Sequence, residues 1–246
     1  MGEPSEQALD WASSVVGAAV TGATALREGG APWMLAFADG GKAVLRKSWA
    51  SDTEIAALRV AVEHDIRAPR LIALGDELML VSAIAGSSRI PVTAAEHRLR
   101  ALGAAAAELH AVELAPTKDL PLRHQSIELT DFTAWRRRAD ATPLLLAAEK
   151  AIAGRSEPPS APVFLHGDLW QGNTMWLDDE FIAVIDWDCA GVGHPGVDLG
   201  SLRCDVAVTF GVEAADVVLE GWQERAGRAA HAMPYWDVVA ALSTPP

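Results

Sequence analysis

Cysteine is scarce in this sequence, which contains only Cys189 and Cys204 among its 246 residues. Two cysteines are too few for a disulfide framework, and their spacing is not that of a zinc finger. We therefore expect both thiols to be reduced and buried, as is usual in a reducing compartment.

Long hydrophobic runs are also missing. No apolar run approaches the roughly 20 residues that a membrane-spanning helix needs, although half of the residues are hydrophobic. The N-terminal residues MGEPSEQALD contain neither the basic region nor the apolar core of a signal peptide. These absences predict a cytoplasmic protein with no membrane partner. The hydrophobic half of the composition is enough for a sizeable core.

Basic residues are fewer than acidic ones. The sequence has 20 Lys and Arg and 33 Asp and Glu, which gives a formal net charge of −13. Because such a protein repels the phosphates of nucleic acids, the composition argues against a nucleic-acid partner. The same excess of acidic groups favours a cationic ligand.

One stretch, residues 163–188, concentrates polar side chains at the ends of apolar segments that read as buried strands. These residues are His166, Asp168, Asn173, Asp186 and Asp188. Capping of strands and turns would explain one or two of them but not all five. The stretch is therefore the candidate site for chemistry.

A hairpin within this stretch brings three of the polar residues together. The chain runs out over Asn173–Leu177 and returns over Phe181–Ile185. Because paired strands lie about 4.8 Å apart, Asp186 should return beside Asn173, near the loop with Asp168. Carboxylate and amide oxygens suit Mg²⁺, which proteins hold with one or two carboxylates plus substrate phosphates. Asn173 and Asp186 are predicted metal ligands, which leaves Asp168 free to accept a hydroxyl proton.

The pattern His166-x-Asp168-x-x-x-x-Asn173, followed by Asp186-Trp187-Asp188, resembles the aminoglycoside phosphotransferase and choline kinase family. Protein kinases have H-R-D-x-x-x-x-N and a later D-F-G, and the present version is the small-molecule form of that pattern. The resemblance implies an α+β, protein kinase-like fold with two lobes. An antiparallel β lobe with one key helix would span residues 1–84, and a mostly helical lobe residues 85–246. It also implies ATP or GTP and Mg²⁺ as cofactors, with Asp168 as the catalytic residue.

The resemblance also assigns nucleotide-binding residues. Arg46 takes the position of the phosphate-binding lysine in the kinase V-A-I-K strand. Strand alternation puts Arg46 on the face of Val44 and Lys47 on the opposite face, so only one of them can enter the cleft; we favour Arg46. Glu54 on the next helix would pair with Arg46, although Ser51-x-x-Glu54 also reads as a capping box.

Further assignments by resemblance concern loops. Gly29 and Gly30 lie where the family has its phosphate-covering loop, although two glycines also mark an ordinary hairpin turn. Backbone groups of Val81, Ser82 and Ala83 would contact adenine at the hinge between the lobes.

Three residues are assigned supporting roles. His166 would brace the catalytic loop, and Asp198 would do so as well or cap the helix that follows it. Asp188 either joins the metal shell or faces the acceptor.

Hydrophobic periodicity places the remaining elements. We expect strands near 21–27, 33–38, 42–47, 71–74 and 78–82. We expect helices near 4–16, 93–112, 130–152 with a break at Pro143, 213–226 and 235–242. A further helix from Ser51 should turn Ile55, Leu58 and Val62 inward. Residues 191–196 read as a loop, and His110 reads as a helix cap.

These patterns predict an ATP-dependent phosphotransferase that acts on a hydroxyl of a small, cationic or amphipathic molecule such as an aminoglycoside. One alternative is a nucleotide-binding module without catalysis, because Arg46 replaces lysine. Another is a metal-dependent hydrolase with His64, Asp65 and His194 among its ligands, which would leave Asn173 without a role.

Overall fold

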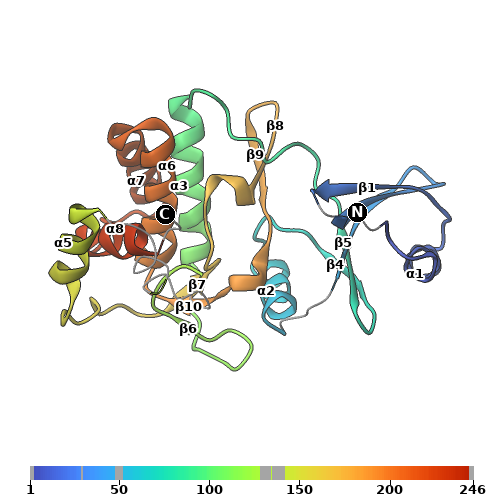
Figure 1. The fold of residues 1–246 in the computed structure, drawn as a ribbon, viewed down its shortest axis with the longest axis horizontal. Helices are drawn as coiled ribbons and strands as arrows, with labels where there is room; N and C mark the ends of the chain where they lie inside the picture. The colour runs from blue at the N-terminus through green and yellow to red at the C-terminus, as the bar shows by residue number, and fades with distance from the viewer. Residues whose placement is uncertain (1–2, 29, 48–51, 128–133, 135–141, 244–246) are drawn as a thin grey trace.

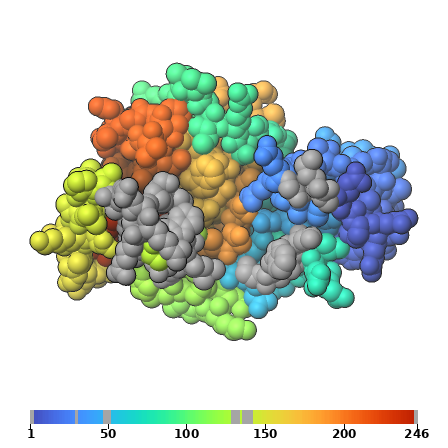
Figure 2. Space-filling view, viewed as in Figure 1, coloured from blue at the N-terminus to red at the C-terminus, as the bar shows by residue number. Residues whose placement is uncertain are grey.

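The computed structural model describes residues 3–28, 30–47, 52–127, 134 and 142–243. A β-rich N-terminal part and a helical C-terminal part lie next to each other along the long axis of the molecule (Figure 1). The same two parts form the opposite ends of the space-filling view (Figure 2). The predicted α+β class is confirmed, with an antiparallel sheet in the first part and the long helices in the second.

The N-terminal sheet has five antiparallel strands in the order β1-β2-β3-β5-β4. Its strands are β1 (Val20–Arg27), β2 (Gly30–Phe37), β3 (Lys42–Lys47), β4 (Leu71–Leu74) and β5 (Leu78–Ser82). Side chains alternate between its faces. Leu45 and Leu80 belong to a small core with helix α1 (Glu6–Val16), whereas Val44 and Val81 pack into the main core.

Helix α2 (Asp52–Glu63) follows β3 and contributes Ala57 and Leu58 to the main core. Its buried residues are Glu54, Ala57, Leu58 and Ala61, which recur at helical spacing. The expectation that Val62 points inward is wrong, because this residue lies one position past the buried stripe and is 58% exposed. Ser51, the first residue of the possible capping box, lies outside the described residues.

The helical part is built around α3 (Glu96–His110) and α7 (Val212–Ala226), which pack with their backbones in close approach. A Cβ atom at Gly103 would lie 2.0 Å from the carbonyl oxygen of Val218, and one at Gly221 would lie 2.3 Å from that of Arg100. Helices α6 (Gly196–Phe210) and α8 (Met233–Leu242) pack on each other, and α6 also packs on α7.

The expected helix near 130–152 is described only in part. Helix α5 (Pro143–Ile152) begins at Pro143, and Thr142 before it is not helical, which agrees with the expected break at this proline. The hydroxyl of Thr142 accepts the N–H of Leu145 at this start. Residues 130–133 and 135–141 lie outside the described residues.

Two small sheets support the candidate site. The predicted hairpin is confirmed as β8 (Thr174–Leu177) and β9 (Glu180–Val184), and its two turn residues, Asp178 and Asp179, have positive φ. A second sheet has the order β6-β10-β7. It contains β6 (Leu122–Arg123), β10 (Gly191–Gly193) and β7 (Val163–Leu165). The loop expected over 191–196 is therefore wrong for its first three residues.

Two remaining expectations concern cysteines and membranes. Cys189 and Cys204 are both half-buried, and not fully buried as expected. Within the described ranges, no helix combines the length and the apolar character needed to cross a bilayer.

Candidate active site

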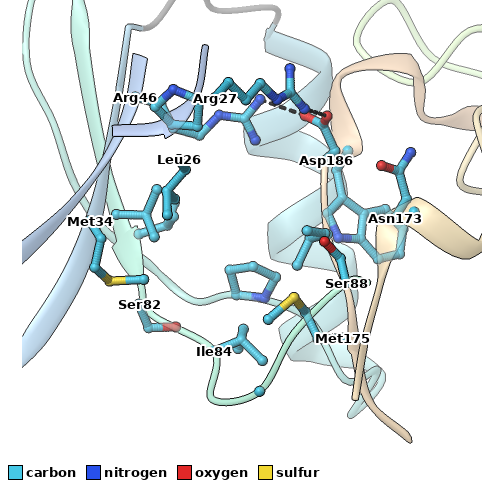
Figure 3. A pocket seen from close by; sticks show the side chains of 18 of the residues that line it. Leu26, Arg27, Met34, Arg46, Ser82, Ile84, Ser88, Asn173, Met175 and Asp186 are labelled. Atoms are coloured by element: carbon cyan, nitrogen blue, oxygen red, sulfur yellow. Dashed lines mark hydrogen bonds and ion pairs between the residues drawn. The ribbon is translucent and has the colours of Figure 1, made fainter. Parts of the chain in front are cut away.

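A cavity of about 570 Å³ lies between the N-terminal sheet, α2 and the β8–β9 hairpin (Figure 3). Its volume is within the range of roughly 300–1,000 Å³ that is typical of small-molecule sites. Apolar side chains cover much of its wall; they include Leu26, Met34, Val44, Val81, Ile84, Met175 and Ile185. Charged groups gather at one end (Figure 3), where Arg27, Arg46 and Asp186 lie with Asn173.

Two arginines converge on Asp186 at this polar end. Arg46 Nη2 lies 2.7 Å from Asp186 Oδ1, and Arg27 Nη2 lies 2.6 Å from Oδ2. Arg46 also bonds through Nη1 to Glu54 Oε1 at 2.6 Å. Arg46 therefore links strand β3, helix α2 and the end of the hairpin, on the same face as Val44.

The charged groups of this cluster change one another's pKa values. Burial raises the pKa of Glu54 to about 7, although the charge of Arg46 opposes this effect. Burial would also raise the pKa of Asp186, but Arg46 and Arg27 outweigh it and hold this pKa below its ordinary value. Asp186 is therefore ionised at neutral pH.

The hairpin fixes where Asp186 lies. The N–H of Ile185 donates to the carbonyl oxygen of Asn173 at 2.9 Å, which aligns the end of the returning strand with the start of the outgoing one. Asp186 then adopts a left-handed conformation with φ of 69°. This conformation is uncommon outside glycine and is best tolerated by Asp and Asn.

Asn173 connects the hairpin to Asp168. Its Nδ2 group donates to the carbonyl oxygen of Asp168 at 2.8 Å and to the carboxylate Oδ2 at 3.1 Å. The amide oxygen consequently points the other way, toward the side where Asp186 lies (Figure 3). Burial raises the pKa of Asp168 to about 6, while His166 and the Asn173 hydrogen bond act in the opposite direction. Asp168 is thus a carboxylate of moderate basicity. It lies near two oxygen ligands suited to a metal ion, the amide of Asn173 and the carboxylate of Asp186.

The loop that carries Asp168 is held by a buried carboxylate on α6. Asp198 accepts the N–H of His166 at 2.7 Å through Oδ2 and that of Gly167 at 2.8 Å through Oδ1. Gly167 has φ of 79°, and a Cβ there would lie 2.0 Å from the carbonyl oxygen of Cys189. Only glycine fits this position.

His166 joins the loop to the hairpin. Its Nδ1 accepts the N–H of Asp168 at 3.3 Å, and its Nε2 lies 2.9 Å from the carbonyl oxygen of Ile185. The ring is fully buried beside Trp187.

His110, at the end of α3, takes part in a buried hydrogen-bond network. The interpretation as a simple cap is wrong, because this side chain is buried and its Nδ1 accepts the indole N–H of Trp222 at 2.9 Å. The neutral ring therefore directs its Nε2 proton toward Asp198 Oδ2, at 3.3 Å. His110 thus extends the hydrogen-bond network behind the loop.

The sequence-derived candidates divide into two groups by position. The cavity wall contains Arg46, Glu54, Val81, Ser82, Asn173 and Asp186. Ala83, Asp168 and Asp188 do not line it, Gly30 is the first residue of β2, and Gly29 lies outside the described residues. Ile84 lines the wall where Ala83 was expected to.

Arg27 was missed by the sequence analysis. It is the last residue of β1 and lies two positions before Gly29 in the sequence, so its position next to an expected phosphate loop was the available signal. Its ion pair with Asp186 joins residues 159 positions apart. Periodicity within a strand does not reveal such a contact.

The donor atoms fit a magnesium ion better than a catalytic zinc. Among the described residues, no three His, Cys, Asp or Glu side chains gather closely enough to hold a metal ion. His64 and Asp65 are exposed beyond α2, and the ring of His194 stacks on Trp236, so the ligand set of the hydrolase alternative does not assemble. The amide oxygen of Asn173 and the carboxylate of Asp186 are the hard donors that Mg²⁺ accepts alongside phosphates.

The structure has a protein kinase-like fold. Its first part is an antiparallel sheet with helix α2, which is ion-paired to the sheet through Glu54 and Arg46, and a cavity separates this part from the helical second part. A model of the phosphotransferase enzyme family, APH, matches residues 24–242. The chain belongs to the phosphotransferase enzyme family. The resemblance noted in the sequence is thereby confirmed.

Solved structures with this fold include the macrolide 2'-phosphotransferase MphH from Brachybacterium faecium. It is 22% identical, with a TM-score of 0.71 over 97% of this chain and 90% of that one. The aminoglycoside phosphotransferase APH(3'')-Id from Streptomyces rimosus, with ADP and streptomycin, is 21% identical over 96% and 98%, with a TM-score of 0.59. APH(2")-IIa, with streptomycin and ATP, is 16% identical over 97% and 92%, with a TM-score of 0.64. A search of curated protein sequences gives no match.

Proposed function

We propose that this protein transfers the γ-phosphate of ATP to a hydroxyl group of a small molecule. The observation that carries the proposal is the cluster in which Asn173 bonds to Asp168 while Asp186 is ion-paired with Arg46. Family membership supports phosphoryl transfer, and two structures of similar fold contain a nucleotide with streptomycin. GTP is the alternative donor.

Asp168 is the proposed catalytic residue. Its carboxylate orients the acceptor hydroxyl and takes its proton as the oxygen attacks the γ-phosphorus, and the bond to the β-phosphate oxygen breaks to release ADP. Asn173 and Asp186 are the proposed ligands of Mg²⁺, which when bound supplies positive charge to the phosphates. Asp188 is close enough to influence the pKa of Asp168 and is assigned a supporting role with His166 and Asp198.

The two arginines are the proposed phosphate-binding groups. Arg46 and Arg27 occupy both oxygens of Asp186, and guanidinium groups bind phosphate oxygens in the same charge-assisted way. Phosphates entering the cavity would compete for these groups and so free Asp186 to bind a metal ion. Glu54 would keep Arg46 extended toward the cavity through their ion pair.

The apolar wall is proposed to enclose the base of the nucleotide. Val81 and Ser82 line it at the end of β5, where backbone groups up to Ala83 would contact adenine. Gly30, the first residue of β2, and its neighbour Gly29 would cover the phosphates. This arrangement divides the chain into a nucleotide-binding lobe, 1–84, and an acceptor lobe, 85–246.

A cationic or amphipathic molecule is the proposed acceptor. The formal charge of −13 attracts cations, and proteins of similar fold include macrolide and aminoglycoside phosphotransferases.

The test is phosphate transfer from labelled ATP, with Mg²⁺, to aminoglycosides, macrolides, choline, homoserine and sugars. We expect at least one acceptor to be phosphorylated, and Asp168→Asn to lower the rate by about 10²–10⁴-fold. The matched control is Asp178→Asn, in the exposed hairpin turn, whose positive φ suits asparagine. Nucleotide binding without transfer to any acceptor would instead identify a non-catalytic module.

A further inference from the structure

We propose that a second cavity, in the helical part, binds a small oxyanion such as phosphate or a carboxylate. This cavity of about 210 Å³ lies between the starts of α6 and α8, the end of α7 and the loop near residue 160. Its described wall consists of Pro159, Ser160, His194, Pro195, Gly196, Leu199, Trp222, Arg228, Ala230, His231 and Met233. None of these residues lines the nucleotide cavity.

Two helix starts meet at this cavity. Gly196 is the first residue of α6 and Met233 the first of α8, and neither helix has a side-chain cap. Helix starts carry partial positive charge, which favours anions. The first turn of α8 contains no acidic residue, and the acid in the first turn of α6, Asp198, is engaged with the catalytic loop.

His194 supplies a buried donor without a partner. Its Nδ1 accepts the N–H of Gly196 at 2.8 Å, so the proton of the neutral ring is on Nε2. The residue is 5% exposed, and within the described part of the chain Nε2 has no hydrogen-bond partner. Burial lowers the pKa of His194 to about 4, helped by His231, His110 and Arg228, so the ring is a neutral donor at pH 7. A buried donor of this kind calls for an acceptor.

Arg228 adds a full positive charge. Its guanidinium carbon lies 5.0 Å from the centre of the Trp222 ring, a cation–π arrangement that positions it at the wall. The ring of His231 lies 6.0 Å from that of His194. In a chain with net charge −13, this described wall contains no Asp or Glu. The acid in the adjoining loop, Glu157, is bonded to His124.

The size and the donors together define the ligand class. The cavity is smaller than the roughly 300 Å³ at which drug-sized sites begin, so its ligand is small. Two side chains of the wall, His194 and Arg228, supply hydrogen-bond donors, and Arg228 is positively charged, which favours a ligand rich in acceptor oxygens. A small oxyanion meets both conditions, and the proposal does not depend on phosphoryl transfer.

The test is a titration of the protein with inorganic phosphate. Binding is monitored by NMR through the ring ¹⁵N and ¹H signals of the histidines. We expect the signals of His194 and His231 to shift in a saturable way. Arg228→Met should weaken this binding about tenfold or more, because it removes a charge-assisted contact. Arg225→Met, which removes a positive charge from α7 at an exposed pair with Glu108, should leave it unchanged.

Phosphate could also bind in the nucleotide cavity. The variant Arg46→Met distinguishes the two sites, because it should leave the His194 and His231 shifts intact. Acetate and citrate in the same titration show whether carboxylates are preferred to phosphate. Histidine signals that do not move with any of these anions, or that move equally in Arg228→Met, would overturn the proposal.

Discussion

Single charged side chains set the electrostatics of the candidate active site. Asp186 is paired with two guanidinium groups and stays ionised, whereas Asp168, which has no arginine partner among the described residues, has its pKa raised by burial. Carboxylates whose environments separate their pKa values are typical of acid and base assignments in active sites. The difference supports distinct roles for the two residues.

The first prediction concerns the pH dependence of transfer. Asp168 accepts a proton only when ionised, and burial places its pKa at about 6. We expect kcat/KM, which reports the free enzyme, to fall about tenfold per pH unit below about pH 6 and to level off above it. Initial rates from about pH 5 to 8 test this. A flat profile through this range would contradict Asp168 as the base.

The second prediction concerns Asp198, which is fully buried and accepts two backbone N–H groups. Asp198→Ala would leave both donors and His110 without their acceptor, so we expect a loss of about 2–5 kcal/mol in the free energy of unfolding. Urea denaturation measures it. The control is Asp216→Ala on α7, whose side chain is 60% exposed and whose ion pair with Arg203 should contribute less than about 1 kcal/mol.

At the scale of elements, glycines decide how closely the chain segments pack. Gly103 and Gly221 let α3 and α7 touch, and Gly191 and Gly193 let β10 fit beside β6. In β10, a Cβ at either glycine would lie 2.5 Å from a carbonyl oxygen. The same glycines gave the sequence the character of a loop, which explains why this strand was not predicted.

The third prediction tests the contact between α3 and α7. In Gly103→Ala the new Cβ would overlap the backbone of Val218, which cannot rotate away, so the helices must move apart. We expect a loss of roughly 1–3 kcal/mol in unfolding free energy, measured by chemical denaturation. Gly22→Ala is the control, because a Cβ there has open space within 4 Å. Equal stability of the two variants would show that the contact is not as tight as described.

At the scale of the whole molecule, the proposed nucleotide cavity lies where the β-rich and helical parts meet. Its walls come from the N-terminal sheet, α2 and the β8–β9 hairpin. A ligand there contacts segments far apart in the sequence and therefore stabilises the fold as a unit.

The fourth prediction follows from this location. Mg-ADP at about 100 times its Kd should add about 2.7 kcal/mol to the free energy of unfolding and raise the melting temperature. Thermal denaturation with and without the ligand measures the shift. Arg46→Met should reduce it, and Arg59→Met, a change on the exposed face of α2, should not. No shift in the unaltered protein would count against nucleotide binding.

The sequence alone determined the features that rest on near neighbours in the chain. The spacing of His166, Asp168 and Asn173, the hairpin after them, and the helical periodicities are local, because turns and repeating apolar positions are set by adjacent residues. These features were enough to predict the α+β class and the family.

Only the tertiary structure decided the contacts between distant segments. Arg46 and Asp186 are 140 positions apart, and Arg27 and Asp186 are 159 apart. Strand β10 exists because β6 and β7 flank it, and the second cavity exists because the starts of α6 and α8 meet. Such contacts depend on how whole elements pack, and the periodicity of a single segment carries no record of its partners.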